Sequence, residues 1–276
     1  MIGMSIESDI LLERPLTPAH QRLLDEAGGI RGFLAHLKEH GVGTVEIRPI
    51  RPEDNPPDMA AIAALLKEYG MGISVHSVPS LDDFDSWSHS MLPVYRMAIT
   101  EQDVFTVTLH PITLRDRAQS FEATVAMLRR FGEIAQRHCP GMRFALENMR
   151  GPYCAVDIIE MVQVANQQNV GTCWDFGHYY YNMVYTGTLL KLPSEEFAAR
   201  AFQTHIHGLV DLDTHYIITQ ETSPYLKPYL NFLNSYGYDG IHNLEITVST
   251  LEPEESMLQA LACSIEAVRS SVPAPE

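Results

Sequence analysis

Acids and histidines stand at matching points of a recurring apolar pattern in this chain. Short apolar runs, each typical of a buried strand, end in a side chain that can bind a metal or move a proton. These residues are Glu46, His76, His110, Glu147, Asp175, His207 and Glu245. A buried carboxylate is costly unless a cation pairs with it. Several acids and imidazoles in one place therefore indicate a divalent metal site.

The residues just before these strand ends support a common register, because side chains alternate between the two faces of a strand. One position back, every residue is apolar, as expected for a face that packs against helices: Val45, Val75, Leu109, Leu146, Trp174, Ile206 and Leu244. Two positions back, most are small or medium-sized: Thr44, Ser74, Thr108, Ala145, Cys173, His205 and Asn243. The second set suits a layer inside a barrel, one level below its mouth.

Carboxylate and imidazole donors without thiolate favour Zn or Mn, with Co, Fe or Mg as alternatives. The first ligand candidates are Glu147, Asp175, His207 and Glu245, followed by His76, His110 and His178. Asp213 and His215 form a D-x-H pattern that either holds a further ion or is a solvated loop pair. His205 shares a face with His207 but lies one layer deeper, so we expect it to support the ligands or to belong to the core.

Four residues are expected to contact a substrate. Tyr179 follows His178 in a predicted loop that could cover the mouth, where an aromatic ring either stacks on a sugar or packs into the core. Arg150 is a candidate anchor for an anionic group. Glu46 and His178 complete the set.

The elements that must position these residues alternate along the whole chain. Strands are predicted at 1–10, 42–47, 72–78, 105–110, 143–148, 170–175, 202–209 and 241–248. Helices are predicted at 30–40, 58–69, 87–100, 117–138, 156–167, 194–201, 225–236 and 253–270. Eight such units favour an α/β fold with one (β/α)8 TIM barrel domain over residues 1–276, whose active site lies at the carboxyl ends of the strands. The alternation is also compatible with an open doubly wound sheet.

Composition narrows the class of partner. The formal net charge of −16 argues against nucleic acid, because phosphate binding draws on Lys and Arg. The four cysteines form no CxxC motif. No signal peptide and no apolar run of membrane-spanning length is apparent, so a cytoplasmic protein is expected. A small sugar-like molecule is the expected partner, and the chain could form a homo-oligomer.

With these residues laid out, the chain resembles the xylose isomerase-like TIM barrel superfamily. The resemblance covers essentially the whole chain and rests on four motifs: Ala145-Leu146-Glu147-Asn148, Cys173-Trp174-Asp175-Phe176-Gly177-His178, His205-Ile206-His207 and Leu244-Glu245-Ile246. The superfamily holds sugar and sugar-phosphate isomerases and epimerases, and also endonuclease IV-type AP endonucleases.

The two branches imply different ligand sets. In the epimerase branch, residues at the positions of Glu147, Asp175, His207 and Glu245 hold one divalent ion, and the two glutamates also move protons. In the endonuclease branch three zinc ions are held by a larger set, which would be His76, His110, Glu147, Asp175, His178, His207, Asp213, His215 and Glu245. This chain departs from the endonuclease pattern at two places. Residues 208–212 form a shorter stretch than the ligand-bearing loop of that branch, and Asn148-Met149-Arg150-Gly151 stands where that branch has a sequence of small residues.

The leading hypothesis is a metal-dependent isomerase or epimerase in which Glu147 and Glu245 exchange the proton alpha to a carbonyl. The alternative is a zinc phosphodiesterase of the AP endonuclease type. A third interpretation, without catalysis, is a ligand-binding barrel with a relict metal site.

Overall fold

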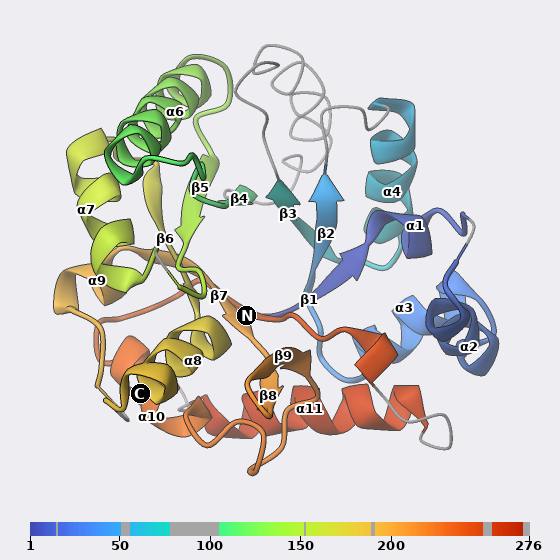
Figure 1. Cartoon of the computed structure of the whole chain (residues 1–276). Coiled ribbons are helices and arrows are strands. Elements are labelled where there is room, and N and C mark those ends of the chain that lie inside the picture. Colours follow the sequence, from blue (N-terminus) through green and yellow to red (C-terminus); the bar gives the residue numbers. More distant parts are fainter. Residues whose placement is uncertain are drawn as a thin grey trace.

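A computed structural model of the chain describes residues 1–14, 16–50, 56–77, 105–151, 153–188, 191–250 and 256–272. Eight parallel strands close into a barrel in the order β1-β10-β7-β6-β5-β4-β3-β2, as Figure 1 shows. They are β1 (Ile2–Glu7), β2 (Thr44–Ile50), β3 (Gly72–Ser77), β4 (Phe105–Leu109), β5 (Met142–Glu147), β6 (Val170–Asp175), β7 (Ala201–Ile206) and β10 (Ile241–Leu244). The predicted single (β/α)8 barrel is confirmed, and the open sheet is excluded.

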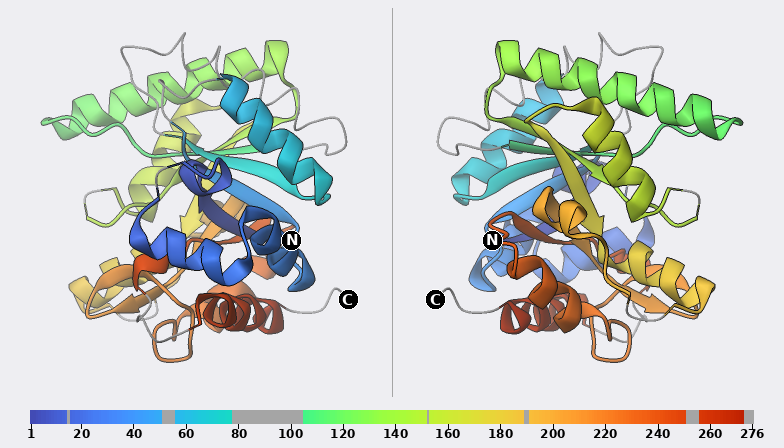
Figure 2. Two further views of the ribbon diagram at one scale, coloured as in Figure 1. Left: turned by 90° about the vertical axis from the view of Figure 1, so that its right-hand side faces the viewer. Right: turned by 90° about the vertical axis from the view of Figure 1, so that its left-hand side faces the viewer.

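Helices surround this barrel, and α6 and α11 lie on opposite sides of it (Figures 1 and 2). The described helices are α1 (Ser8–Leu11), α2 (Pro18–Ala27), α3 (Ile30–Glu39), α4 (Pro56–Glu68), α6 (Arg117–His138), α7 (Ala155–Ala165), α8 (Phe176–Thr186), α9 (Glu195–Ala199), α10 (Leu226–Asn234) and α11 (Met257–Ser271), with a 3-10 turn, η2, at Val248–Thr250. The predicted helix at 87–100 lies outside the described residues.

The alternation of the strands is the one expected from the sequence. All seven apolar residues that precede the strand-end acids and histidines are fully buried and belong to the hydrophobic core. Trp174, for example, packs against Phe197 of α9 and against Tyr229 and Phe232 of α10. The residues two positions back from each strand-end acid or histidine are buried as well. The apolar face of each strand therefore meets the helices, and the polar face lines the interior.

The segments that follow the sixth and the seventh strands differ from the prediction. The prediction of a loop after His178 is wrong, because helix α8 starts directly after β6. The carboxylate of Asp175 caps this helix by accepting the backbone N–H of His178 (2.6 Å). The helix ends at Gly187, which has φ 70°. The seventh strand ends at Ile206, and a short antiparallel hairpin, β8 (Gly208–Val210) with β9 (Asp213–Tyr216), follows it.

Helix α2 has no counterpart in the prediction. Thr17 caps it by accepting the backbone N–H of His20 (3.2 Å), Pro18 opens it and Gly28 closes it with φ 74°. None of the helices in the described part of the chain combines the length and the apolar character needed to cross a bilayer.

Candidate metal centre

Three acids meet at the carboxyl ends of the strands. Glu147 and Asp175 are the last residues of β5 and β6, and Glu245 directly follows β10. Their side chains are at most 5% exposed. Asn148 holds two of these strand ends together, because its side chain accepts the backbone N–H of Asp175 (2.9 Å) and donates to the Asp175 carbonyl (3.0 Å). The acids are thus placed by the backbone, as the strand-end register predicted.

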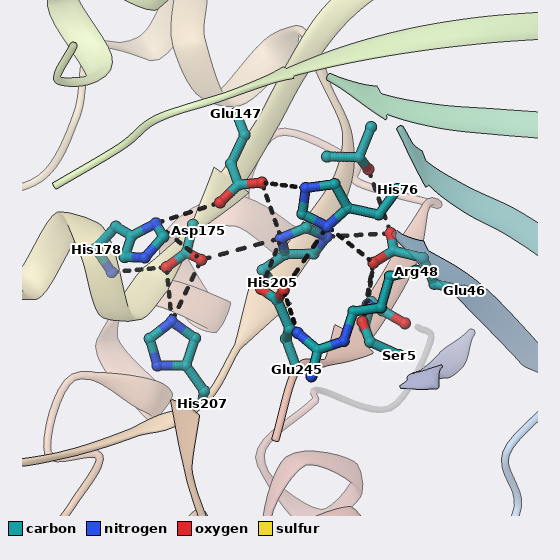
Figure 3. A network of polar contacts seen from close by, with 12 residues as sticks. Ser5, Glu46, Arg48, His76, Glu147, Asp175, His178, His205, His207 and Glu245 are labelled. Atoms are coloured by element: carbon teal, nitrogen blue, oxygen red, sulfur yellow. Dashed lines mark hydrogen bonds and ion pairs between the residues drawn. The ribbon is translucent and has the colours of Figure 1, made fainter. Parts of the chain in front are cut away.

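His205 lies between these acids, as Figure 3 shows. Its Nδ1 atom is 3.2 Å from Oε2 of Glu147, 3.1 Å from Oε2 of Glu245 and 3.9 Å from Oδ2 of Asp175. One ligand atom from each of the four side chains lies within 4.8 Å of all the others. His205 had been expected one layer below the ligands, and the structure brings it into direct contact with them.

A second group consists of imidazoles. His178, His207 and His215 each place a ring nitrogen within 4.8 Å of the others. Nε2 of His207 contacts both carboxylate oxygens of Asp175, at 3.1 and 3.3 Å, so this group adjoins the three acids. Gly177 makes room for it, because a Cβ atom there would lie 1.9 Å from Cε1 of His207.

A third group lies on the other side of Glu147. His76 and His110 place their Nε2 atoms 2.8 Å apart, and Oε2 of Glu147 lies 3.5 and 3.3 Å from the two rings. Glu147 therefore belongs to the group of three acids and to this one, and it could bridge two ions.

Glu46 lies beneath the acids and has no exposed surface. Its carboxylate accepts hydrogen bonds from Ser5 (2.8 Å), Thr108 (3.3 Å), Asn243 (3.3 Å) and, at shorter distance, Gln203. Glu46 also contacts His205, whose Nε2 lies 3.1 Å from Oε2 of Glu46. In this structure the carboxylate proposed to contact a substrate is enclosed by protein groups.

Arg48 is the cation nearest to Glu245. Its guanidinium donates to Glu245 (2.5 Å) and to Glu7 (3.3 Å), and its side chain is 12% exposed. Its place two residues after Glu46 on β2 puts it on the same face of that strand.

The charges in this cluster offset one another. Burial favours neutral carboxyl groups, yet the pKa values of Glu147 and Glu245 lie well below their usual range because the charge of His205, together with His110 or Arg48, outweighs burial. Burial would lower the pKa of His178, but Asp175 and Glu147 raise it to about 9. Burial lowers the pKa of His207. The carboxylates are therefore ionised, as metal ligands must be.

The donor atoms fit a divalent ion. Several buried atoms that face this point make no hydrogen bond in the described part of the chain: both carboxylate oxygens of Glu147, Oε2 of Glu245, and Nδ1 of His76, His178 and His205. Nδ1 of His178 lies 3.2 Å from Oε1 of Glu147, and Nδ1 of His205 lies 3.2 Å from Oε2 of Glu147 and 3.1 Å from Oε2 of Glu245, in each case without hydrogen-bond geometry. Unpartnered buried polar atoms are rare in native proteins, and a divalent ion, toward which each carboxylate and each deprotonated ring nitrogen would turn a lone pair, is a candidate partner for them.

The remaining candidates lie away from this point. Asp213 is exposed, and its side chain accepts the backbone N–H of Thr214 (3.0 Å). Tyr179 is buried in the core against Trp174 and Tyr229. Arg150 is exposed, with its guanidinium 5.7 Å from the centre of the Tyr181 ring.

The chain matches the family described as xylose isomerase-like TIM barrel over residues 34–267. A search of curated proteins found no significant match. Among solved structures, the fold is similar to D-psicose 3-epimerase with D-tagatose from Clostridium cellulolyticum H10, with TM-score 0.70, 14% identity and coverage of 98% of this chain and 99% of that one.

Two further structures of this fold contain a divalent metal. One is the IOLI protein with a zinc atom, with TM-score 0.59, 16% identity and coverage of 97% of this chain and 95% of that one. The other is a xylose isomerase-like TIM barrel protein from Mycobacterium smegmatis in complex with magnesium, with TM-score 0.62, 13% identity and coverage of 98% of this chain and 95% of that one.

Proposed function

Because this chain belongs to the xylose isomerase-like TIM barrel family, we propose that it is a divalent-metal-dependent isomerase or epimerase of a sugar or sugar phosphate. One observation carries the proposal. The ligand atoms of Glu147, Asp175 and Glu245 converge with an imidazole in a buried cluster, in which both carboxylate oxygens of Glu147 and Oε2 of Glu245 make no hydrogen bond among the described residues. The epimerase among the similar structures gives the reaction class.

The three acids and an imidazole would hold the ion, with Zn or Mn as the expected metal and Co or Mg as alternatives. A bound divalent ion supplies Lewis acidity, which polarises a carbonyl and makes the adjacent C–H bond more acidic. His178 and Glu46 stay candidates for substrate contact beside this cluster, and Arg150 and Tyr179 stay candidates at a greater distance.

The protons are moved by Glu147 and Glu245. The two glutamates stand on β5 and β10, and β6 and β7 separate these strands in the barrel. A substrate between them presents opposite faces of its alpha carbon to the two carboxylates. One glutamate removes the alpha proton as general base, and the other donates a proton to the opposite face as general acid. Such an exchange inverts the configuration at that carbon.

Proton transfer at the alpha carbon can be followed without knowledge of the natural substrate. The purified protein, loaded with Mn, Co or Zn, is incubated in D2O with a panel of ketoses, aldoses and their phosphates, including D-tagatose. We expect deuterium to appear by NMR at the carbon next to the carbonyl of at least one sugar. No exchange with any sugar in any metal form would contradict the proposal.

The histidine groups on either side of the acids support a second candidate. His76 and His110 with Glu147, and His178 with His207 and His215, could hold further zinc ions, as a phosphodiesterase of the AP endonuclease type requires. This candidate expects cleavage of an abasic duplex that stops when a chelator is added. Asp213, which the resemblance assigns to that ligand set, is exposed and turned to its own backbone.

A further inference from the structure

One arginine spans the place where the last strand of the barrel meets the first. We propose that Arg48 is a positioning residue for the proton transfer: it holds one carboxylate oxygen of Glu245, is itself anchored on Glu7, and leaves the other oxygen of Glu245 free. This role rests on the proposed function, because it takes Glu245 as one of the two proton-transfer residues.

The order of the strands shows why a long side chain is needed. Strand β1 lies between β2 and β10, and Glu7 on β1 is paired in register with Arg48 on β2. Neighbouring strands are about 4.8 Å apart, so about 10 Å separates the backbones of β2 and β10. Arg48 reaches past β1 and meets Glu245, which directly follows β10. The contact joins two positions that are 197 residues apart in the chain.

The guanidinium of Arg48 uses two nitrogens for two acids. Nη1 donates to Oε1 of Glu245 (2.5 Å), and Nη2 donates to Oε1 of Glu7 (3.3 Å). The side chains of Arg48 and Glu245 are 12% and 5% exposed, so salt and water screen this ion pair little. The planar guanidinium holds both acids in a fixed geometry, which the single ammonium group of a lysine does not provide.

Glu245 is therefore held through one oxygen and free at the other. Oε2 makes no hydrogen bond among the described residues and faces the candidate centre, 3.1 Å from Nδ1 of His205 and 3.6 Å from Nε2 of His215. Figure 3 shows Arg48 beside Glu245. Glu147 differs, because neither of its oxygens makes a hydrogen bond in the described part of the chain.

Proton transfer depends on the orientation of the acid or base. The oxygen that moves the proton must lie within hydrogen-bond reach of that proton, and a displacement of about 1 Å can lower a rate by about 10²-fold. Without a partner for Oε1, the carboxylate of Glu245 could rotate and exchange its two oxygens. Because Arg48 prevents this rotation, its loss should lower kcat rather than the affinity for the substrate.

The first test is a double-mutant cycle on the metal-free protein, which needs neither a substrate nor an ion. Urea unfolding in EDTA compares the unmodified protein with Arg48→Met, Glu245→Gln and the variant that carries both changes. We expect a coupling of at least about tenfold in the unfolding equilibrium constant, because loss of Arg48 costs less once Glu245 is neutral. The control cycle is Arg31→Met with Glu68→Gln, an exposed ion pair (2.6 Å) whose coupling should be about fivefold at most.

The second test is the rate of deuterium exchange with the sugar that the panel identifies, at a saturating concentration of the metal. We expect Arg48→Met to lower kcat by about 10–100-fold and to leave KM within about threefold. Arg48→Lys should recover part of this loss, because it keeps a cation that can donate to Glu245. Arg31→Met should retain the full rate.

Two kinds of result would overturn the role of Arg48. One is a coupling with Glu245 no larger than that of the control pair. The other is a normal kcat in Arg48→Met, with or without a raised KM, since a raised KM alone would mean that Arg48 contacts the substrate instead.

Arg48→Lys and Glu7→Gln keep the test available if Arg48→Met does not fold. Both should lower kcat at unchanged KM, and normal rates in both would overturn the role of Arg48. If the unmodified protein exchanges no sugar, the proposed function fails, and the cycle still decides whether Arg48 holds Glu245.

Discussion

Glu46 and His205 form a buried pair at the floor of the candidate metal centre, with Oε2 of the acid 3.1 Å from Nε2 of the ring and no exposed surface on either side chain. The carboxylate of Glu46 is the charged end of the pair and faces the barrel interior. At the other end, Nδ1 of His205 faces the acids above. Burial favours the neutral form of Glu46, but the imidazoles of His205 and His76 lower its pKa well below the usual range. Glu46 is therefore an ionised support for the ring.

The two proposed proton-transfer residues can be tested by replacing each carboxylate with the amide of glutamine, which cannot act as a general base. We expect Glu147→Gln and Glu245→Gln each to lower kcat by at least about a hundredfold, because general acid–base catalysis typically contributes 10²–10⁴-fold. Far-UV circular dichroism should be unchanged, since the substitutions keep the side-chain volume. The rate is measured as deuterium exchange into the substrate found in the sugar panel.

Glu160→Gln on α7 is the control for this pair, because Glu160 is exposed and lies outside the metal groups. It should retain the full rate. Near-normal rates in both Glu147→Gln and Glu245→Gln would exclude the two-glutamate mechanism.

The stability of the metal-free protein should depend on pH in a defined way. The pKa of His178 is raised from 6.5 to about 9 in the folded protein, so its stabilising contribution is complete below pH 6.5 and is lost as pH rises through 9. The pKa values of Glu147 and Glu245 are lowered from 4.5, so their contribution is present above pH 4.5 and is lost on acidification. The contributions of these three groups are all complete between pH 4.5 and 6.5.

Urea unfolding in the presence of EDTA, at a series of pH values, measures this profile. His178→Asn should flatten the fall in the free energy of unfolding between pH 6.5 and 9. His138→Asn, at the exposed end of α6, should leave the fall unchanged. A profile of His178→Asn that parallels the unmodified protein would show that its imidazole does not titrate with folding.

Gly177 tests the close contact between α8 and the histidine group. In Gly177→Ala the new Cβ would lie 1.9 Å from Cε1 of His207, which is fully buried, so the ring must move. Overpacking of this kind costs about 1–3 kcal/mol, more than the gain of 1 kcal/mol or less that Ala brings to a helix. We expect a loss of stability and weaker metal binding.

The control is Gly43→Ala, where the nearest atom to the new Cβ would be Cγ of Met1 at 3.4 Å, an ordinary contact. Urea unfolding and Co²⁺ titration compare the two variants. Equal stability and equal affinity in Gly177→Ala and Gly43→Ala would mean that the position of His207 does not depend on Gly177.

The sequence was sufficient for the barrel and for most of the acids and histidines that the structure brings together at the strand ends. Alternation along each strand assigns a side chain to the inside or the outside, and it did so correctly for Trp174 and for Asp175. The acids at the ends of β5, β6 and β10 could be recognised because an ionisable residue interrupts an apolar run.

The alternation of side chains along a strand could not predict which residues of two neighbouring strands stand at the same height in the barrel. The stagger between β6 and β7 pairs Asp175 with His205, and this offset depends on how the whole barrel closes. His205 was therefore placed one layer too deep. Helix α8 was missed although its signals are present, namely Asp175 as N-cap and Gly187 at the end, because Asp175 had been considered only as a ligand.

Metal content of the purified protein, in equivalents per chain by elemental analysis, tests the central claim most directly. We expect about one equivalent of a divalent metal, Zn or Mn first, or its full uptake on reconstitution. About three equivalents of Zn would instead favour the phosphodiesterase, because the two histidine groups would then be occupied as well. No bound metal, even after reconstitution with each candidate ion, would contradict the assignment of Glu147, Asp175 and Glu245 as ligands.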